Sequence, residues 1–219
     1  MPSDTFLSRL QYGAHSTVAR AWYGLAGFRH PMRIEMWEQI QTGIDTTTTP
    51  LECTEIWQWA RACEKIPGDM AELGVYNGAT AAIMLKAAPS KTLHLFDTFE
   101  GLPDSEGKFD KGEWNGSLDS VKRNLSRWND RIGYHVGLFP ESAAHFDSTF
   151  SFVHLDADLY SSTKAGLEWF WPRLSQGGAI LSHDYPLSEG VVRAFHEFFA
   201  DKRETFIPLS GSNCVAIKS

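Results

Sequence analysis

The sequence contains few cysteines and no motif that would pair them or place them around a metal. Cys53, Cys63 and Cys214 are scattered along 219 residues, and no two of them have the C-x-x-C spacing. Such a set is typical neither of a disulfide framework nor of a zinc site. We therefore expect three reduced thiols that act as small apolar residues, as in a cytoplasmic protein.

Long apolar runs and basic stretches are missing as well. No uninterrupted apolar segment approaches the roughly 18 residues that a membrane span needs, and the first residues do not resemble a secretion signal. The chain has 20 Lys and Arg against 27 Asp and Glu, a net charge of −7, with no basic stripe. We therefore exclude membranes and nucleic acids as main partners and expect a globular protein.

The length suits one α/β domain with a short terminal extension. Apolar residues at spacings of three and four predict an amphipathic helix over about 10–25, and a second helix ends at Pro67-Gly68. We divide the chain into a helical extension, 1–66, that caps one end of a domain formed by 67–219. We expect a homo-oligomer, a dimer, with the extension as a candidate subunit contact.

From residue 68 onward, strand and helix patterns alternate. Crossover helices between strands predict a parallel sheet with helices on both faces, the α/β Rossmann-like class. The turn Ser210-Gly211-Ser212 separates two late strand patterns and predicts a final hairpin that adds one antiparallel strand. The expected strands cover 70–75, 92–97, 132–136, 150–155, 178–182, 205–209 and 213–218, and the expected helices 78–88, 118–128, 162–174 and 189–200.

One long segment, 99–117, does not fit the alternation. It is rich in Gly and charge and carries Phe109 and Trp114. Loops of this length in a compact domain are usually lids or solvated inserts, and both interpretations stay open.

A glycine-containing loop, Glu72-Leu-Gly-Val-Tyr-Asn-Gly78, follows the first strand of the alternation. Asp97 ends the next strand 19 residues after Gly78, where a carboxylate can accept hydrogen bonds from both hydroxyls of a ribose. The sequence lacks G-x-G-x-x-G, and the Glu72 carboxylate would repel phosphate, so we favour a nucleoside ligand over a dinucleotide. The alternative is a structural turn.

Acidic residues and an imidazole follow two later strands. Asp156 and Asp158 come after an apolar strand, and His183-Asp184 comes after another. The carboxyl ends of parallel strands share one edge, so these groups should converge on a divalent metal. The alternative is a hydrogen-bonded cluster that caps helices. We expect His154, within its strand, to be a core residue and not a ligand.

These motifs resemble those of the macrocin O-methyltransferase family. The resemblance rests on Glu72–Gly78, Asp97-Thr-Phe-Glu-Gly-Leu-Pro103, Leu155-Asp-Ala-Asp-Leu-Tyr160 and His183-Asp-Tyr185. It implies a class I methyltransferase fold, a mostly parallel seven-stranded sheet with an antiparallel last strand. It also implies S-adenosylmethionine as methyl donor, usually Mg²⁺, and a hydroxylated natural product as acceptor, most simply a sugar.

The resemblance also assigns roles to residues of the expected cofactor site. The ribose is expected on Asp97, and the lid helix of the family begins at Ser117. Asp156 is expected to contact the cofactor, bind metal and act as base. The methionine end is expected against Glu72, Gly74, Tyr76 and Gly78, with Asn77 in the same loop, and the adenosine against Thr98, Phe99, Leu138 and Phe139.

The metal site departs from the family pattern, which usually ends in two adjacent aspartates. Here the pair is His183-Asp184, so the expected ligands are Asp156, His183 and Asp184. Imidazole suits Mn²⁺ and other transition metals better than it suits Mg²⁺. We expect metal-assisted deprotonation of the acceptor, with Asp156 or His183 taking the proton. Two alternatives stay open, a metal-free O- or N-methyltransferase with His183 as general base and a non-catalytic cofactor-binding module.

Overall fold

The computed structural model describes Ile40 and residues 42–219, so the helix expected over 10–25 lies outside the described residues. Seven strands form one sheet in the order β3-β2-β1-β4-β5-β7-β6. The strands are β1 (Asp69–Leu73), β2 (Leu93–Asp97), β3 (Ile132–Val136), β4 (Phe150–Leu155), β5 (Leu174–Ser182), β6 (Phe206–Pro208) and β7 (Cys214–Ile217).

The first five strands run parallel, and β7 is antiparallel to both of its neighbours. The predicted hairpin is therefore confirmed. Because β7 runs against β5, its first residue, Cys214, pairs with the last residue of β5, Ser182. The turn before β7 thus lies at the edge where the parallel strands end. The strand order reverses between β1 and β4, where ligands bind in sheets of this kind.

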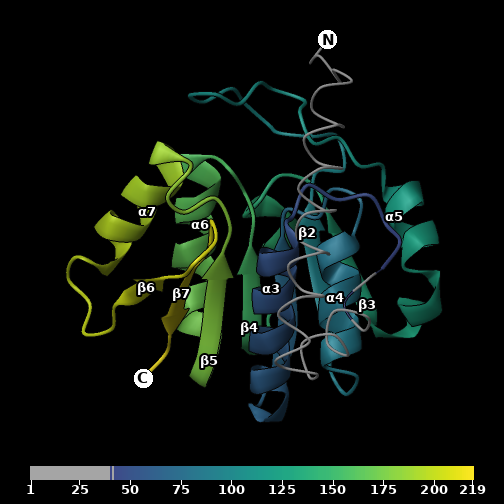
Figure 1. Ribbon diagram of the computed structural model, residues 1–219, viewed down its shortest axis with the longest axis horizontal. Coiled ribbons are helices and arrows are strands. Elements are labelled where there is room, and N and C mark those ends of the chain that lie inside the picture. The colour runs from purple at the N-terminus through teal and green to yellow at the C-terminus, as the bar shows by residue number, and fades with distance from the viewer. Residues whose placement is uncertain (1–39, 41) are drawn as a thin grey trace, which may run out of the picture.

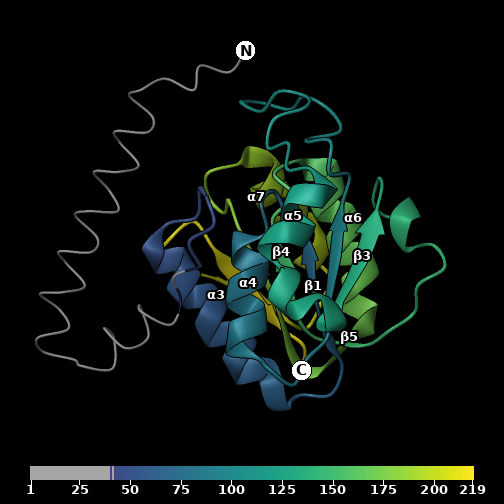
Figure 2. The ribbon, with the colours of Figure 1, turned by 90° about the vertical axis from the view of Figure 1, so that its right-hand side faces the viewer.

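Helices cover both faces of the sheet, as predicted (Figures 1 and 2). One face carries α3 (Pro50–Ala62), α4 (Ala79–Ala87) and α5 (Leu118–Asn124), and the other carries α6 (Tyr160–Phe170) and α7 (Glu189–Phe199). The helix expected over 118–128 ends at Asn124, and the chain continues in a 3₁₀ turn, Ser126–Arg131. Further 3₁₀ turns are Cys63–Lys65, Glu141–Ala143 and Trp171–Arg173. Among the described residues, no helix is both long and apolar enough to cross a membrane.

Helix α3 belongs to the same core as the sheet. It begins with a capping box, in which Thr49 and Glu52 each accept a backbone N–H from the other, and has proline at its first position. Ile56 and Ala60 are fully buried in a cluster that also contains Met70 of β1. The described part of the predicted extension therefore packs as an integral layer. The division at residue 66 and the dimer stay predictions.

Strands covered on both faces need apolar residues throughout, and β4 shows this most clearly, since all six of its residues are buried.

All three cysteines are free and buried, as expected. Burial raises the pKa of Cys53 to about 12, so its thiol is un-ionised.

Two histidines form a hydrogen-bonded pair near one edge of the sheet, away from the strand ends. His94 Nδ1 lies 3.1 Å from His135 Nε2, and His94 Nε2 lies 3.3 Å from Asp69 Oδ2. His135 stacks on Phe96, with ring centroids 4.3 Å apart. Burial, together with the neighbouring His94, lowers the pKa of His135 from 6.5 to about 4.

This pair predicts a loss of stability in acid. Unfolded His135 binds a proton below a pH of about 6.5 and folded His135 only below about 4, so the unfolded state is favoured as the pH falls through that window. His135→Phe keeps a ring on Phe96 and removes the titration. We expect the melting temperature of the wild type to fall more between pH 7 and pH 4 than that of the variant, measured by calorimetry. Parallel curves for the two proteins would contradict the assignment.

Candidate active site

A cavity of about 320 Å³ opens at the carboxyl ends of the parallel strands. Its wall includes the residues that follow β1, β2, β4 and β5, which is the convergence that the sequence predicted. Of the predicted site residues, the cavity is lined by Gly74, Tyr76, Asn77, Asp97, Thr98, Leu138, Phe139, Asp156, His183 and Asp184.

The loop after β1 is held against its neighbours by backbone contacts. Gly74 has a φ of +87°, and a Cβ at this position would lie 1.8 Å from the carbonyl oxygen of Asp156. Asp97 Oδ2 accepts the N–H groups of Val75 at 2.6 Å and Tyr76 at 3.4 Å. Burial raises the pKa of Asp97, although its backbone hydrogen bonds act in the opposite direction. The strand end thus presents a carboxylate beside a tightly turned backbone.

The other four predicted cofactor residues, Glu72, Gly78, Phe99 and Ser117, are not on the cavity wall. Glu72 is fully buried, and its Oε1 lies 2.8 Å from Nδ1 of His154, which is itself a core residue as expected. Gly78 and Ser117 are the N-cap residues of α4 and α5, and Phe99 packs in the core. These residues support the loops that form the wall.

An acidic cluster with one imidazole occupies the far side of the cavity. Asp156, His183 and Asp184 each offer one ligand atom, and these atoms lie within 4.8 Å of one another. His183 Nδ1 is 3.1 Å from Asp156 Oδ1 and 3.8 Å from Asp184 Oδ1. Asp158 is the third acid, and burial together with Asp184 and Asp156 raises its pKa well above the usual value. This shift favours the neutral form of Asp158, which reduces the repulsion within the cluster.

The charges of the cluster favour a protonated His183. Burial alone would lower the pKa of His183, but the Asp156 carboxylate, with Glu52 and Asp184, raises it well above 6.5. Burial likewise opposes ionisation of Asp156, but the neighbouring His183 holds the pKa of that carboxyl below its usual value. In the metal-free chain, then, Asp156 is the ionised acceptor and His183 the cation.

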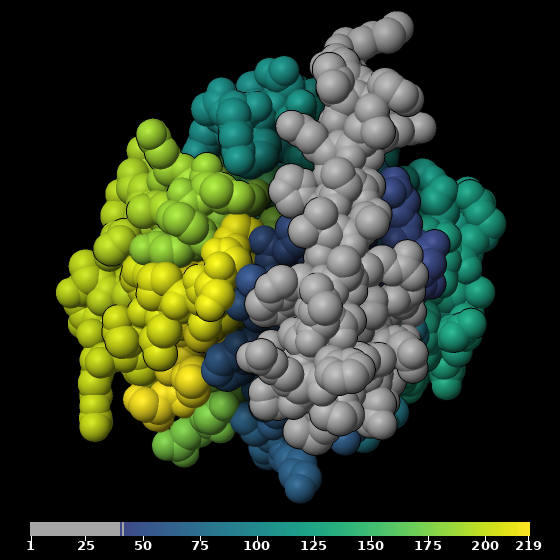
Figure 3. Space-filling view, viewed as in Figure 1, coloured from purple at the N-terminus to yellow at the C-terminus, as the bar shows by residue number. Residues whose placement is uncertain are grey.

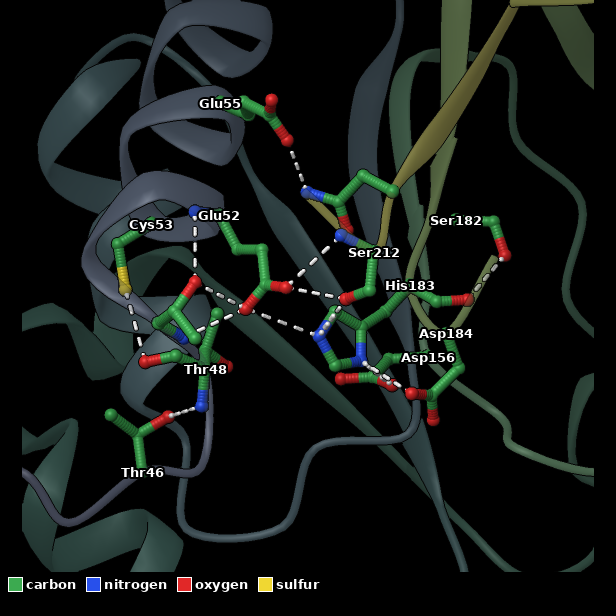
Figure 4. Close-up of polar contacts among 12 residues, drawn as sticks. Thr46, Thr48, Glu52, Cys53, Glu55, Asp156, Ser182, His183, Asp184 and Ser212 are labelled. Atoms are coloured by element: carbon green, nitrogen blue, oxygen red, sulfur yellow. Dashed lines mark hydrogen bonds and ion pairs between the residues drawn. The ribbon is translucent and has the colours of Figure 1, made fainter. Parts of the chain in front are cut away.

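Two residues of the cluster were missed in the sequence, Glu52 on α3 and Ser212 in the turn before β7. Glu52 Oε2 lies 3.5 Å from His183 Nε2, and Ser212 Oγ lies 3.2 Å from the same nitrogen (Figure 4). The signal for Glu52 is its place on a helix face shared with Ile56 and Ala60, since a carboxylate on a buried apolar face needs a partner. Thr46–Thr49, just before α3, also line the cavity.

The long segment 99–117 forms part of the cavity wall, which favours the lid interpretation. In Figure 3 it rises in teal above the yellow-green surface of α7. Phe109 is buried, and Trp114 packs edge-on against Tyr76 with centroids 5.8 Å apart. The Glu106 carboxylate accepts the N–H of Tyr160 at 3.1 Å and so joins the segment to the first turn of α6.

The sequence of the chain was compared with the profiles of known protein families. Residues 56–212 match the sequence profile described as Macrocin-O-methyltransferase (TylF). The chain belongs to the macrocin O-methyltransferase family. The predicted resemblance is therefore confirmed.

Curated relatives of this family member include two O-methyltransferases of Streptomyces species. The 8-demethyl-8-(2,3-dimethoxy-alpha-L-rhamnosyl)-tetracenomycin-C 4'-O-methyltransferase of Streptomyces olivaceus is 30% identical over 61% of this chain and 58% of its own length. The demethyldecarbamoylnovobiocin O-methyltransferase of Streptomyces niveus is 28% identical over 62% and 59%. The chain thus matches about three fifths of the length of these relatives.

Solved structures confirm the fold. The O-methyltransferase NovP superposes with a TM-score of 0.68 at 21% identity, over 80% of this chain and 83% of its own. The calicheamicin methyltransferase CalS11 gives 0.63 at 19% identity, over 85% and 93%. The sheet of this macrocin O-methyltransferase family member is that of the class I O-methyltransferases.

The close approach at Gly74 yields a stability prediction. Gly74→Ala places a Cβ against the Asp156 carbonyl, whereas Gly107, with a φ of +60°, has nothing within 4 Å of the equivalent position. Shifting a packed structure to make room for an added methyl group costs about 1–3 kcal/mol, roughly 2–12 °C in melting temperature. We expect Gly74→Ala to melt several degrees below the matched control Gly107→Ala, which has the strained φ without the clash. Equal melting temperatures would show that the two loops do not touch.

Proposed function

We propose that this protein is an S-adenosylmethionine-dependent O-methyltransferase that methylates a sugar hydroxyl of a natural product with the help of a divalent metal. The observation that carries the proposal is the single cavity that joins the glycine loop and Asp97 to the acid and imidazole cluster. The family membership and the O-methyltransferase names of the relatives support the reaction class. The rhamnosyl group in the first relative's name supports a sugar acceptor.

The cofactor half of the proposal rests on the strand ends of β1 and β2. Asp97 faces the cavity, and its carboxylate oxygens can each accept more than one hydrogen bond, so ribose hydroxyls can share them with the backbone. Leu138 and Phe139 provide apolar wall for an adenine ring. S-adenosylmethionine supplies an electrophilic methyl group when bound.

The metal half rests on the donor set of the cluster. Two carboxylates and one imidazole, with donor atoms within 4.8 Å of one another, fit a divalent ion that accepts both oxygen and nitrogen. Asp156, His183 and Asp184 would hold it, with His183 neutral. A bound ion lowers the pKa of an alcohol and orients it.

We assign Asp156 as the general base that takes the proton from the acceptor hydroxyl. This carboxylate is ionised and its side chain is 25% exposed, on the cavity wall. The neighbouring carboxylates raise the pKa of His183 well above 6.5 and favour its protonated form, in which neither ring nitrogen can accept a proton. That state argues against the metal-free alternative in which His183 acts as general base at neutral pH.

Replacing the base tests the proposal directly. Asp156→Asn keeps the volume and removes the charge, and we expect kcat to fall by about 10²–10⁴-fold with S-adenosylhomocysteine affinity largely intact. Turnover would be followed as S-adenosylhomocysteine release over a panel of glycosylated natural products, with binding followed by calorimetry.

The matched control is Asp147→Asn, since the Asp147 side chain is 96% exposed. Wild-type rates in Asp156→Asn would remove that residue from the mechanism. Cofactor binding without methyl transfer to any acceptor would favour the non-catalytic alternative.

The donor set also predicts metal preference. A site with one imidazole should bind Mn²⁺ more tightly than Mg²⁺, and an oxygen ligand at residue 183 should lower that ratio by on the order of tenfold. His183→Asp introduces a carboxylate, and His183→Asn an oxygen without the additional charge. Mn²⁺ and Mg²⁺ affinities would be measured by calorimetry on chelator-treated protein.

Full activity after exhaustive EDTA treatment would contradict the metal route and favour the metal-free enzyme. An unchanged Mn²⁺ to Mg²⁺ ratio in both variants would show that His183 is not a ligand. The melting temperature of each variant serves as the folding control.

A further inference from the structure

A carboxylate from outside the strand ends reaches the cluster from the side of α3. Glu52 is 5% exposed, and its two oxygens are held by separate segments of the chain. Oε2 accepts the N–H and the Oγ–H of Thr49, both at 2.7 Å. Oε1 accepts the N–H of Ser212 at 3.2 Å and also its hydroxyl. The Glu52 carboxylate therefore has a fixed position before anything binds in the cavity.

The hydrogen atoms in this network have only one consistent arrangement. Oε2 of Glu52 already accepts two hydrogen bonds from Thr49, and Oε1 accepts the N–H of Ser212, so the carboxylate is placed as an acceptor on both oxygens. The Ser212 hydroxyl therefore donates to Glu52. Its oxygen then accepts from the other neighbour, Nε2 of His183, at 3.2 Å. Nε2 must carry a hydrogen.

We propose that Glu52 is a positioning residue that, through Ser212, keeps Nε2 of His183 protonated and leaves Nδ1 as the nitrogen that acts in the cavity. Figure 4 shows the His183 ring between the two sides, with Nε2 toward Glu52 and Ser212 and Nδ1 toward Asp156. Carboxylate partners of this kind fix the tautomer of metal-binding histidines. The inference rests on the proposed function for its metal, and on the hydrogen-bond geometry alone for its tautomer.

The carboxylates on the two sides of the His183 ring differ in how firmly they are fixed in place. Glu52 has hydrogen bonds from four donor groups and 7% side-chain exposure, whereas the Asp156 side chain is 25% exposed. A cation in the cavity would reach Nδ1 and not Nε2, so the hydrogen that it displaces is the one facing Asp156. Nδ1 then points its lone pair at the space between Asp156 and Asp184, where a cation would lie.

Metal affinity gives the first test, with Mn²⁺ as the probe. Glu52→Gln and Ser212→Ala should each weaken Mn²⁺ binding by about 10–100-fold and leave S-adenosylhomocysteine affinity within about twofold. Gln at this position retains a side-chain acceptor for the capping box of α3. Ser212→Ala leaves that helix untouched.

The chain offers a matched control for each variant. Glu55 lies on the same helix, and its carboxylate accepts the hydrogen bond of Asn213 Nδ2 at 2.7 Å instead of one from Ser212. Ser210 is an exposed residue of the same turn as Ser212. Glu55→Gln and Ser210→Ala should bind Mn²⁺ as the wild type does. Wild-type affinity in both Glu52→Gln and Ser212→Ala would overturn the inference.

The second test reads the ring hydrogens by ¹⁵N NMR of the full chain with S-adenosylhomocysteine. We expect a slowly exchanging Nε2–H signal in the metal-free protein that persists when diamagnetic Zn²⁺ is added, and rapid exchange of that signal in Ser212→Ala. A persistent hydrogen on Nδ1 with metal bound, or an Nε2–H signal that Ser212→Ala leaves unchanged, would overturn the inference.

The two tests separate this inference from the proposed function. If the wild type binds no metal, the metal part of the proposed function fails, and the exchange rate of the Nε2–H signal in the wild type and in Ser212→Ala still decides whether Glu52 and Ser212 hold that hydrogen.

Discussion

One imidazole has to balance the charge of several carboxylates that the fold brings to a single place. His183 lies between Asp156 on one side and Glu52 on the other, with Asp184 within 3.8 Å. Without it, Asp156 and Glu52 would meet like charges in a poorly hydrated site, and at least one of them would be forced to take up a proton. Asp158 shows this effect, since burial together with Asp184 and Asp156 raises its pKa well above the usual value and favours its neutral form. The ionisation state of the whole site therefore depends on His183.

The topology brings these partners together from four segments. Parallel strands β4 and β5 deliver Asp156 and His183 to the same edge, and Asp156 N bonds Leu73 O of β1 at 2.9 Å, which aligns that edge with the glycine loop. The antiparallel β7 begins where β5 ends, so Ser212 arrives beside His183. Helix α3, which packs on one face of the sheet, places Glu52 beside His183. A segment that the sequence presents as an N-terminal extension thus completes the site.

The site residues at the ends of strands could be predicted from the sequence. The site residues that tertiary packing brings in could not. Asp97 ends an apolar strand, Asp156 and His183 each follow one, and the sharing of one edge by parallel strands is a general property of such sheets. Glu72 is also an acidic residue near the end of an apolar strand, but its side chain is buried against His154 and does not reach the cavity wall. Glu52 and Ser212 are 160 residues apart. No local pattern joins them, because their contact depends on the packing of α3 against the sheet.

The histidine at residue 183 and the glutamate at residue 52 make physical sense together. The resemblance in the sequence implied an aspartate at the position of His183, which would suit an all-oxygen magnesium site. In this chain an aspartate there would face Glu52 as well as Asp156, and two anchored carboxylates at such distances repel strongly when desolvated. An imidazole removes that conflict, because its Nε2–H serves the Glu52 side while its Nδ1 serves the cavity. Under the proposed function the imidazole would supply a nitrogen ligand, and the site would then favour softer divalent ions over Mg²⁺. A Glu52 carboxylate fixed by α3 would therefore select histidine at residue 183, and through it the class of metal.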